Sequence, residues 1–136
     1  IIAQRLVRRL CPDSKMAYKL TASEISDLKK SVDLDRILEI LRARKIMPAN
    51  ADWSDITWYR PQSSETCPGG YKGRIAIAEV LEVTDRIRDL IVKGVSGDEI
   101  EKAAREDGML TMQESGFLAA ARGITSIEEV LRAARE

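Results

Sequence analysis

Four short helical segments between residues 84 and 136 constrain the fold of this chain more than any other sequence feature. Each segment opens at a hydroxyl side chain, and these are Thr84, Ser96, Thr111 and Thr125. The last three are each followed by a glutamate three residues later, which is the spacing of a capping box. The first three segments end at a glycine, a residue that commonly terminates helices, namely Gly94, Gly108 and Gly123. We therefore expect a small bundle of four helices, each of about ten residues.

Two more capped helices are predicted in the first half of the chain. Thr21 and Glu24 form a further capping box, with an apolar face that begins at Ile25. Asp33 can cap a helix over residues 33–45, whose apolar stripe is Leu34, Ile37, Leu38 and Leu41. Both segments are amphipathic, so both are expected to pack one face against a core.

The first ten residues are also predicted to form an amphipathic helix. Ile2, Leu6 and Leu10 recur at i, i+4 and i+8, and the arginines lie mostly between them. Pro12 follows closely and would stop such a helix.

Residues 47–70 are rich in loop-forming residues and separate two short predicted strands. Residues 56–60 (ITWYR) form the first strand, and residues 73–80 (GRIAIAEV) form the second. We expect these strands to pair antiparallel and to pack on helices, because a two-stranded unit alone is marginally stable. The predicted class is α+β, mainly α, with a small helical bundle and a short antiparallel β-hairpin.

Composition excludes several classes of function. The 136 residues include 22 Lys and Arg, 22 Asp and Glu, and no His. His-dependent triads, His metal ligands and a His pH switch are therefore excluded, and no G-x-x-x-x-G-K-[ST] phosphate loop occurs. Zero net charge removes the general attraction to nucleic acid, so that role would rest on Arg5, Arg8 and Arg9 alone. The two cysteines are typical of a reducing compartment.

Two local patterns have both a structural and a functional interpretation. In GGYKGR (residues 69–74), the glycines allow a tight turn before a strand, while Lys72 and Arg74 could contact an anion or an acidic partner. Cys11 is followed by Ser14, and Cys67 is preceded by Ser64, so each cysteine is half of a C-x-x-C knuckle. Two thiolates without His make a poor zinc site. The cysteines are therefore structural or unbonded thiols, or they mark a degenerate knuckle without metal.

Four segments, taken in order, resemble the C-terminal end of the type II secretion ATPase E and type IV pilus extension ATPase family. They are AQRLVRRLCPDS, SSETCPGGYKGRIAIAEVLEV, RIRDLIVKG and AREDGMLTMQESGFLAAARGITSIEEVLR. The resemblance runs from residue 3 to about residue 132. It implies a hexameric motor at the cytoplasmic face of the inner membrane, whose ATP- and Mg-binding core with its Walker and His boxes lies upstream. The chain does not begin with Met, so we expect it to be the tail of such an ATPase.

The resemblance also implies a division of the chain and a set of interface or structural residues. Residues 1–10 would end the RecA-like core as a helix, 11–70 would form a degenerate metal-knuckle subdomain, and 71–136 a strand with a helical C-terminal subdomain. The implied interface or structural residues are Gln4, Arg5, Tyr71, Lys72, Gly73, Arg74, Glu79 and Arg88. No catalytic or cofactor-binding residue is expected on this chain.

The family's four zinc ligands would fall on Cys11, Ser14, Ser64 and Cys67, so two ligands are replaced by serine. We therefore expect no stable zinc and a subdomain held by side-chain packing instead. The packing residues would be Tyr18, Leu20, Ile25, Leu28, Trp58 and Tyr59. A Cys11–Cys67 disulfide is a second possibility, although a cytoplasmic protein would keep it reduced.

The resemblance predicts a non-catalytic part of a motor that powers protein secretion or pilus extension. Its partners would be its own ATPase core, neighbouring subunits of a hexamer and the inner-membrane platform with its associated proteins, without nucleic acid. The alternative is a free-standing helical adaptor that binds a protein partner through the same helices.

Overall fold

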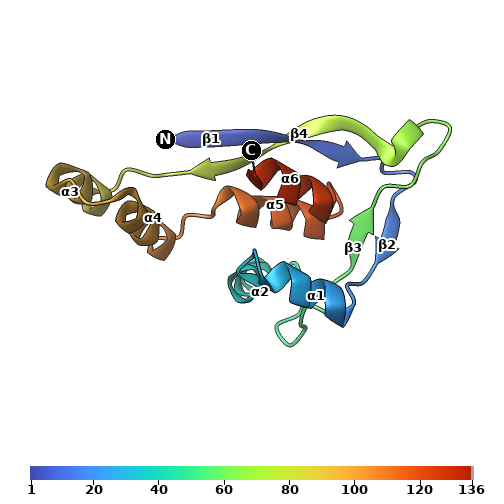
Figure 1. Cartoon of the computed structure of the whole chain (residues 1–136), viewed down its shortest axis with the longest axis horizontal. Coiled ribbons are helices and arrows are strands. Elements are labelled where there is room, and N and C mark those ends of the chain that lie inside the picture. Colours follow the sequence, from blue (N-terminus) through green and yellow to red (C-terminus); the bar gives the residue numbers. More distant parts are fainter. Residues whose placement is uncertain (136) are drawn as a thin grey trace.

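The computed structural model describes residues 1–135, which form two small antiparallel sheets and six α-helices (Figure 1). The elements follow the order β1 (Ile2–Leu10), β2 (Met16–Tyr18), α1 (Ala22–Lys29), α2 (Leu34–Ala43), β3 (Trp58–Arg60), a 3-10 turn (Pro68–Gly70), β4 (Tyr71–Val80), α3 (Asp85–Lys93), α4 (Gly97–Glu106), α5 (Met112–Ala121) and α6 (Ile127–Arg135). The predicted α+β class, mainly α, is confirmed. The predicted bundle of four C-terminal helices is wrong, because α3 packs on α4 and α5 packs on α6 as two separate pairs.

The predicted helix over residues 1–10 is wrong, because this segment is strand β1. The i, i+4, i+8 spacing that favoured a helix also puts Ile2 and Leu6 on one face of a strand, where both are exposed. Val7 lies on the opposite face and is fully buried. A β-bulge between Arg8 and Leu10 then turns Leu10 inward, so the period-2 pattern is interrupted within the strand.

The predicted pairing of the two middle strands is also wrong. Strand β4 pairs antiparallel with β1, with Leu6 opposite Ala76, and β3 pairs with β2, with Tyr18 opposite Trp58. Both partner strands lie in segments for which no strand was predicted, since β2 has only three residues and β1 has a helix-like pattern.

Helix α5 lies at the centre of the molecule, between the β1–β4 sheet and the α2 region (Figure 1). Its buried Phe117 packs edge-on against Trp53 and Trp58, whose rings stack 5.4 Å apart. Gly116 allows α6 to approach closely, because a Cβ atom at this position would meet Val130 Cγ1 at 2.5 Å. The main core therefore joins segments from both halves of the chain.

The predicted helix caps are largely confirmed. Complete capping boxes form at Thr21 and Thr111, and the hydroxyls of Thr84 and Ser96 each accept one backbone hydrogen bond. Helix α6 is the exception, since it begins after Ser126, whose hydroxyl accepts from the Glu129 N–H at 3.3 Å. The expected cap, Thr125, is buried and donates its hydroxyl to the Arg8 carbonyl at 2.8 Å. The preceding threonine thus ties the α6 start to β1, and the neighbouring serine does the capping.

Helices α3 and α4 form an arm at one end of the molecule, away from the main core (Figure 1). The arm has a small apolar cluster of its own, built on Ile87, Ala103 and Ala104. Arg86 of α3 pairs with Glu106 and Asp107 at the end of α4, at 2.7 and 2.9 Å. These contacts hold the two helices against each other.

Candidate functional site

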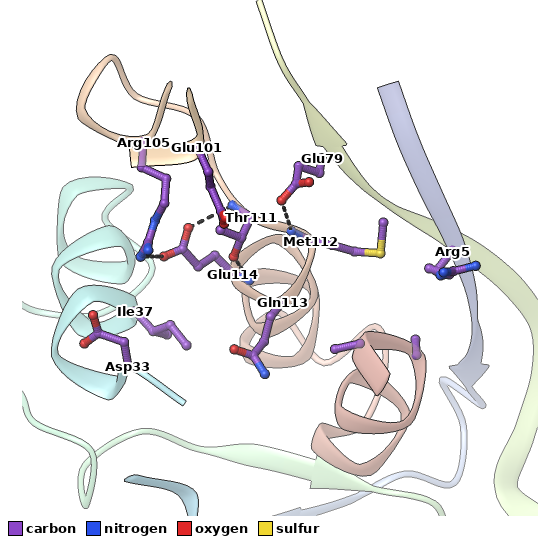
Figure 2. Close-up of a pocket in the computed structure, with 12 residues that line it drawn as sticks. Arg5, Asp33, Ile37, Glu79, Glu101, Arg105, Thr111, Met112, Gln113 and Glu114 are labelled. Atoms are coloured by element: carbon purple, nitrogen blue, oxygen red, sulfur yellow. Dashed lines mark hydrogen bonds and ion pairs between the residues drawn. The ribbon is translucent and has the colours of Figure 1, made fainter. Parts of the chain in front are cut away.

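A pocket lined largely by polar side chains lies where the arm meets the body of the molecule. Its volume is about 480 Å³, and it is bordered by β1, β4, α2, α4, α5 and α6 (Figure 2). Arg5 and Glu79 reach it from the two strands, whereas Glu101, Arg105 and Glu114 reach it from the helices. Four elements, β1, β4, α4 and α5, therefore contribute charged side chains to one place.

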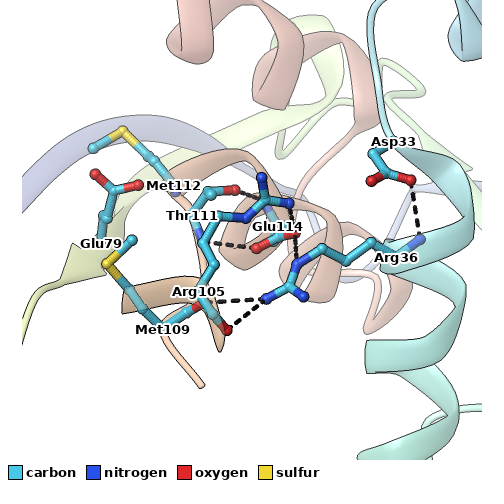
Figure 3. Close-up of polar contacts among 8 residues, drawn as sticks. All are labelled: Asp33, Arg36, Glu79, Arg105, Met109, Thr111, Met112 and Glu114. Carbon is cyan, nitrogen blue, oxygen red and sulfur yellow. Dashed lines mark hydrogen bonds and ion pairs between the residues drawn. The ribbon is translucent and has the colours of Figure 1, made fainter. Parts of the chain in front are cut away.

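Glu114 is the buried centre of this charged group. Its side chain is only 4% exposed, and one oxygen accepts from Arg36 Nε at 2.6 Å and lies 3.4 Å from Arg105 Nη2 (Figure 3). The other oxygen accepts from the Thr111 backbone N–H at 2.8 Å as part of the α5 capping box. One carboxylate thus caps α5 and joins α2 to α4, because a buried charge needs such partners to be tolerated.

Arg36 extends the connection from α2 to the arm. Its Nη2 donates to the carbonyl oxygens of Met109 at 3.3 Å and Arg105 at 3.5 Å (Figure 3). These carbonyls lie at the end of α4 and in the link between α4 and α5. A guanidinium has donors enough to bind a carboxylate and two carbonyls at once. Arg36 therefore fixes the point at which the arm leaves the body.

Glu79 holds the other side of the pocket. Its Oε1 accepts from the Met112 N–H at 3.3 Å, at the first residue of α5 (Figure 2). A carboxylate in this position also complements the positive end of the helix dipole. Arg5 lines the same pocket from β1. The structure thus brings together two of the residues implied by the resemblance, Arg5 and Glu79, beside a helix start.

A second buried carboxylate, Glu129, links α6 to β1. It is 1% exposed and pairs with Arg8 and Arg132. Burial raises the pKa of Glu129, but hydrogen bonds from Arg132 and Arg8 outweigh this and leave the pKa below its usual value. Tyr71 lies beside this group, because its hydroxyl is 2.8 Å from Ser126 Oγ and the Arg8 guanidinium lies 4.2 Å from its ring centroid.

Three cations at the start of β4 and the end of β1 lie apart from both carboxylates. Lys72, Arg74 and Arg9 are exposed, and none has an ion pair within residues 1–135. Arg74 lies opposite Arg8 across the sheet, an arrangement that like charges disfavour. Gly73 separates Lys72 from Arg74 at φ +78°, a conformation suited to glycine. The tight turn predicted before the strand is present as the 3-10 turn Pro68–Gly70, and Lys72 and Arg74 follow it on β4.

The remaining predicted residues lie elsewhere. Gln4 is exposed on β1 opposite Ala78. Arg88 is exposed on α3, where it lies 3.5 Å from Asp85. The structure does not bring either residue to the pocket, and their interface roles stay predictions.

The two cysteines form a disulfide, with Cα atoms 6.2 Å apart. Both are buried, and neither sulfur is available as a thiolate. Ser64 Oγ accepts from the Cys67 N–H at 3.1 Å, whereas the buried Ser14 Oγ has no hydrogen-bond partner among residues 1–135. Bonded sulfurs and two serine hydroxyls do not suit zinc, which binds thiolate sulfur and imidazole. The two halves of the predicted knuckle are thus adjacent, but the structure shows a disulfide there and not a zinc knuckle.

Side-chain packing also supports this region, as the sequence predicted. Leu20 and Trp58 are buried in the main core, and Tyr18, Ile25 and Leu28 pack against it. Tyr59 differs, since its ring lies under the Lys15 ammonium at 4.7 Å. Packing and the disulfide therefore act together.

Within residues 1–135, no group of three or more His, Cys, Asp or Glu side chains could hold a metal ion. None of the helices described is long and apolar enough to cross a bilayer. The charged groups connect elements of the fold. We refer to the contacts of Glu114 with Arg36, Arg105 and the Thr111 N–H as the joint at Glu114.

Sequence reasoning missed the contacts of Arg36 and Arg105 with Glu114, and those of Ser126 and Glu129 in the second group. Glu114 was identified only as a capping residue. Its burial depends on Arg36, which is 78 residues away. No short-range pattern reports such a contact.

Comparisons with known proteins give this geometry a context. The family model described as type II/IV secretion system protein matches residues 1–132. The chain is 37% identical over 132 residues to the type IV pilus assembly ATPase PilB of Thermus thermophilus, covering 96% of this chain and 13% of that protein. It is 37% identical to the type II secretion system protein E of Xanthomonas campestris, covering 97% and 20%. It is 32% identical over 136 residues to PilB of Pseudomonas aeruginosa, covering 100% and 21%. The chain therefore spans about a fifth or less of these relatives.

Proposed function

Because this chain belongs to the type II/IV secretion system protein family, we propose that it is a non-catalytic C-terminal part of a hexameric motor ATPase. In the whole motor, an ATPase core supplied by other residues binds ATP and Mg²⁺. The present residues couple the resulting motion to the inner-membrane machinery for protein secretion or pilus extension. The motor is then cytoplasmic and peripheral to the inner membrane, where the Cys11–Cys67 pair would be kept reduced.

The observation that carries this proposal is the pattern of coverage. Two relatives named as ATPases match nearly the whole of this chain, yet the match occupies only 13% and 21% of their length. A segment that contains no phosphate loop and no His would not turn over ATP by itself. Its role in the motor would then be to contact other parts of the assembly.

The open face of the β1–β4 sheet supports a contact with the ATPase core. Ile2, Leu6 and Val80 are 64%, 53% and 53% exposed on this face. A two-stranded sheet with one bare apolar face is marginal alone, and further strands or an apolar surface would stabilise it. Arg9, Lys72 and Arg74 extend from the same sheet and would meet the core or a neighbouring subunit.

The joint at Glu114 supports the coupling part of the proposal. It ties the arm to α2 through Arg36 and to α5 through the capping box. A force applied to the arm would therefore reach the β1–β4 sheet through α5, which packs on β4.

ATP turnover by the purified chain tests the proposal. We expect no Mg²⁺-dependent hydrolysis above that of a mock purification and no binding of a fluorescent ATP analogue. Turnover that co-purifies with the chain and disappears on mutation of its own residues would overturn the proposal. A free-standing adaptor would also lack ATP turnover. It differs from a motor part because it would still bind its protein partner when no ATPase core is joined to it.

A further inference from the structure

A groove between α1 and α6 has an apolar floor and is separate from the joint at Glu114. Its volume is about 320 Å³, at the lower end of the range for binding pockets, so a short segment suits it better than a large cofactor. Its floor is formed by Tyr18, Leu20, Leu28, Ile127 and Leu131. We refer to it as the α1–α6 groove.

Helix α1 leaves part of its apolar face available to this groove. None of its residues is buried, and Ile25 and Leu28 are only partly covered by the main core. An eight-residue helix owes most of its stability to packing of its apolar face. A further apolar group in the groove would therefore complete the packing of α1.

The rim of the α1–α6 groove is predominantly acidic. Three exposed carboxylates line it, Glu24 and Asp27 from α1 and Glu128 from α6, against one guanidinium, Arg135. The lining charge is thus three negative and one positive, or −2. Lys30 lies 3.6 Å from Asp27 on the exposed side of α1. Such a rim attracts cations and disfavours anionic surfaces.

The pKa of Tyr18, which lines the groove, responds to the same rim carboxylates. Burial, followed by the charge of Glu128, raises the pKa of Tyr18 to about 12, with a further contribution from Glu24. Arg60 opposes this shift, and its guanidinium lies 3.8 Å from the centroid of the Tyr18 ring. The two rim carboxylates thus act on one point although they lie on different helices.

We propose that the α1–α6 groove binds a short segment of a partner protein in which apolar side chains are flanked by lysine or arginine. The apolar side chains would enter between Leu28 and Leu131, and the flanking cations would pair with Glu24, Asp27 and Glu128. This inference does not depend on the ATPase proposal, because a chain of any function could present the groove.

The test uses the whole chain and a defined probe. The probe is a fluorescein-labelled peptide with leucines at i, i+3 and i+4 and lysines at both ends, and binding is followed by fluorescence anisotropy. One control peptide has glutamate in place of lysine, and the other has serine in place of leucine. We expect binding only of the original peptide, and weaker binding as salt is raised.

Protein variants locate the site. The triple variant Glu24→Gln, Asp27→Asn and Glu128→Gln should weaken binding about tenfold, because three exposed charge pairs are lost. Gln at position 24 retains an oxygen for the Thr21 N–H, so α1 keeps its cap. A matched variant on other surfaces, which are Asp35→Asn, Glu39→Gln and Glu82→Gln, removes the same charge and should leave binding unchanged.

The proposal is overturned by equal weakening in both triple variants, by equal binding of the glutamate peptide, or by no binding of the lysine peptide. It is also overturned if the chain self-associates and the groove variant abolishes that association, because the occupant is then a second copy. Loss of binding in Leu28→Gln, with an unchanged circular dichroism spectrum, would support the apolar floor. Retained affinity in that variant would refute it.

Discussion

Replacing Glu114 with alanine should destabilise this chain more than any exposed charge substitution. The change removes a carboxylate that is 4% exposed and leaves Arg36 and Arg105 without their shared anion. Deleting one partner of a fully buried ion pair costs about 3–5 kcal/mol. The two arginines are 27% and 32% exposed, so water replaces part of the lost interaction. We therefore expect the loss of the ion pairs to lower the free energy of unfolding by about 2 kcal/mol. Loss of the hydrogen bond to the Thr111 N–H adds about 1 kcal/mol.

Urea unfolding followed by tryptophan fluorescence measures this loss, because Trp53 and Trp58 are both buried in the main core. With a denaturant slope of about 2 kcal/mol/M, a loss of about 3 kcal/mol lowers the midpoint by about 1.5 M. Glu114→Gln should lose less, since its amide oxygen still accepts from the Thr111 N–H. Glu106→Ala, which breaks an exposed pair with Arg86, is the control and should barely move the midpoint. A midpoint for Glu114→Ala equal to that of the control would refute the buried-joint reasoning.

Three further predictions address other contacts. Reduction of the Cys11–Cys67 disulfide should lower the free energy of unfolding by about 2–4 kcal/mol, whereas a metal chelator should leave it unchanged. Equal melting temperatures with and without dithiothreitol would contradict this. Gly116→Ala should lower the free energy of unfolding in urea by about 1–3 kcal/mol, because the added Cβ would collide with α6. Gly97→Ala is the control and should leave it unchanged, because a Cβ there would meet nothing within 4 Å. Similar losses in both variants would show that the α5–α6 approach is not tight. The pKa of Glu129 is lower in the folded chain than in the unfolded chain. Its contribution to stability is therefore fully present above its unfolded pKa of about 4.3 and is lost as the pH falls through its folded pKa. A Glu129→Gln variant whose acid-unfolding profile matches that of the unmodified chain would contradict this prediction.

Local signals in the sequence located the helices well. The hydroxyl at a helix start and the glycine at its end act within one turn of the chain, so Thr111 and Gly94 could be read directly. The α6 start shows the limit of this reasoning. Thr125 and Ser126 are both capable caps, and the contact of Thr125 with the Arg8 carbonyl, 117 residues away, decides between them.

The strands were harder to predict because their partners are remote. Leu6 and Ile2 fit a helical stripe and a strand face equally well, and only pairing with β4 selects the strand. The bulge before Leu10 further breaks the alternation that would have revealed it. The same applies to the candidate site, since Arg5 and Glu79 were implied by the resemblance, while Arg36 meets Glu114 only through tertiary packing.

The most direct test of the central claim is ATP hydrolysis by a chimera. This chain replaces the segment of the Thermus thermophilus PilB that it matches, over which the two are 37% identical. We predict that the chimera hydrolyses ATP and assembles as the unmodified PilB does, while the isolated chain does neither. A chimera that folds and binds ATP but neither hydrolyses it nor assembles would contradict the claim that these residues serve a motor ATPase.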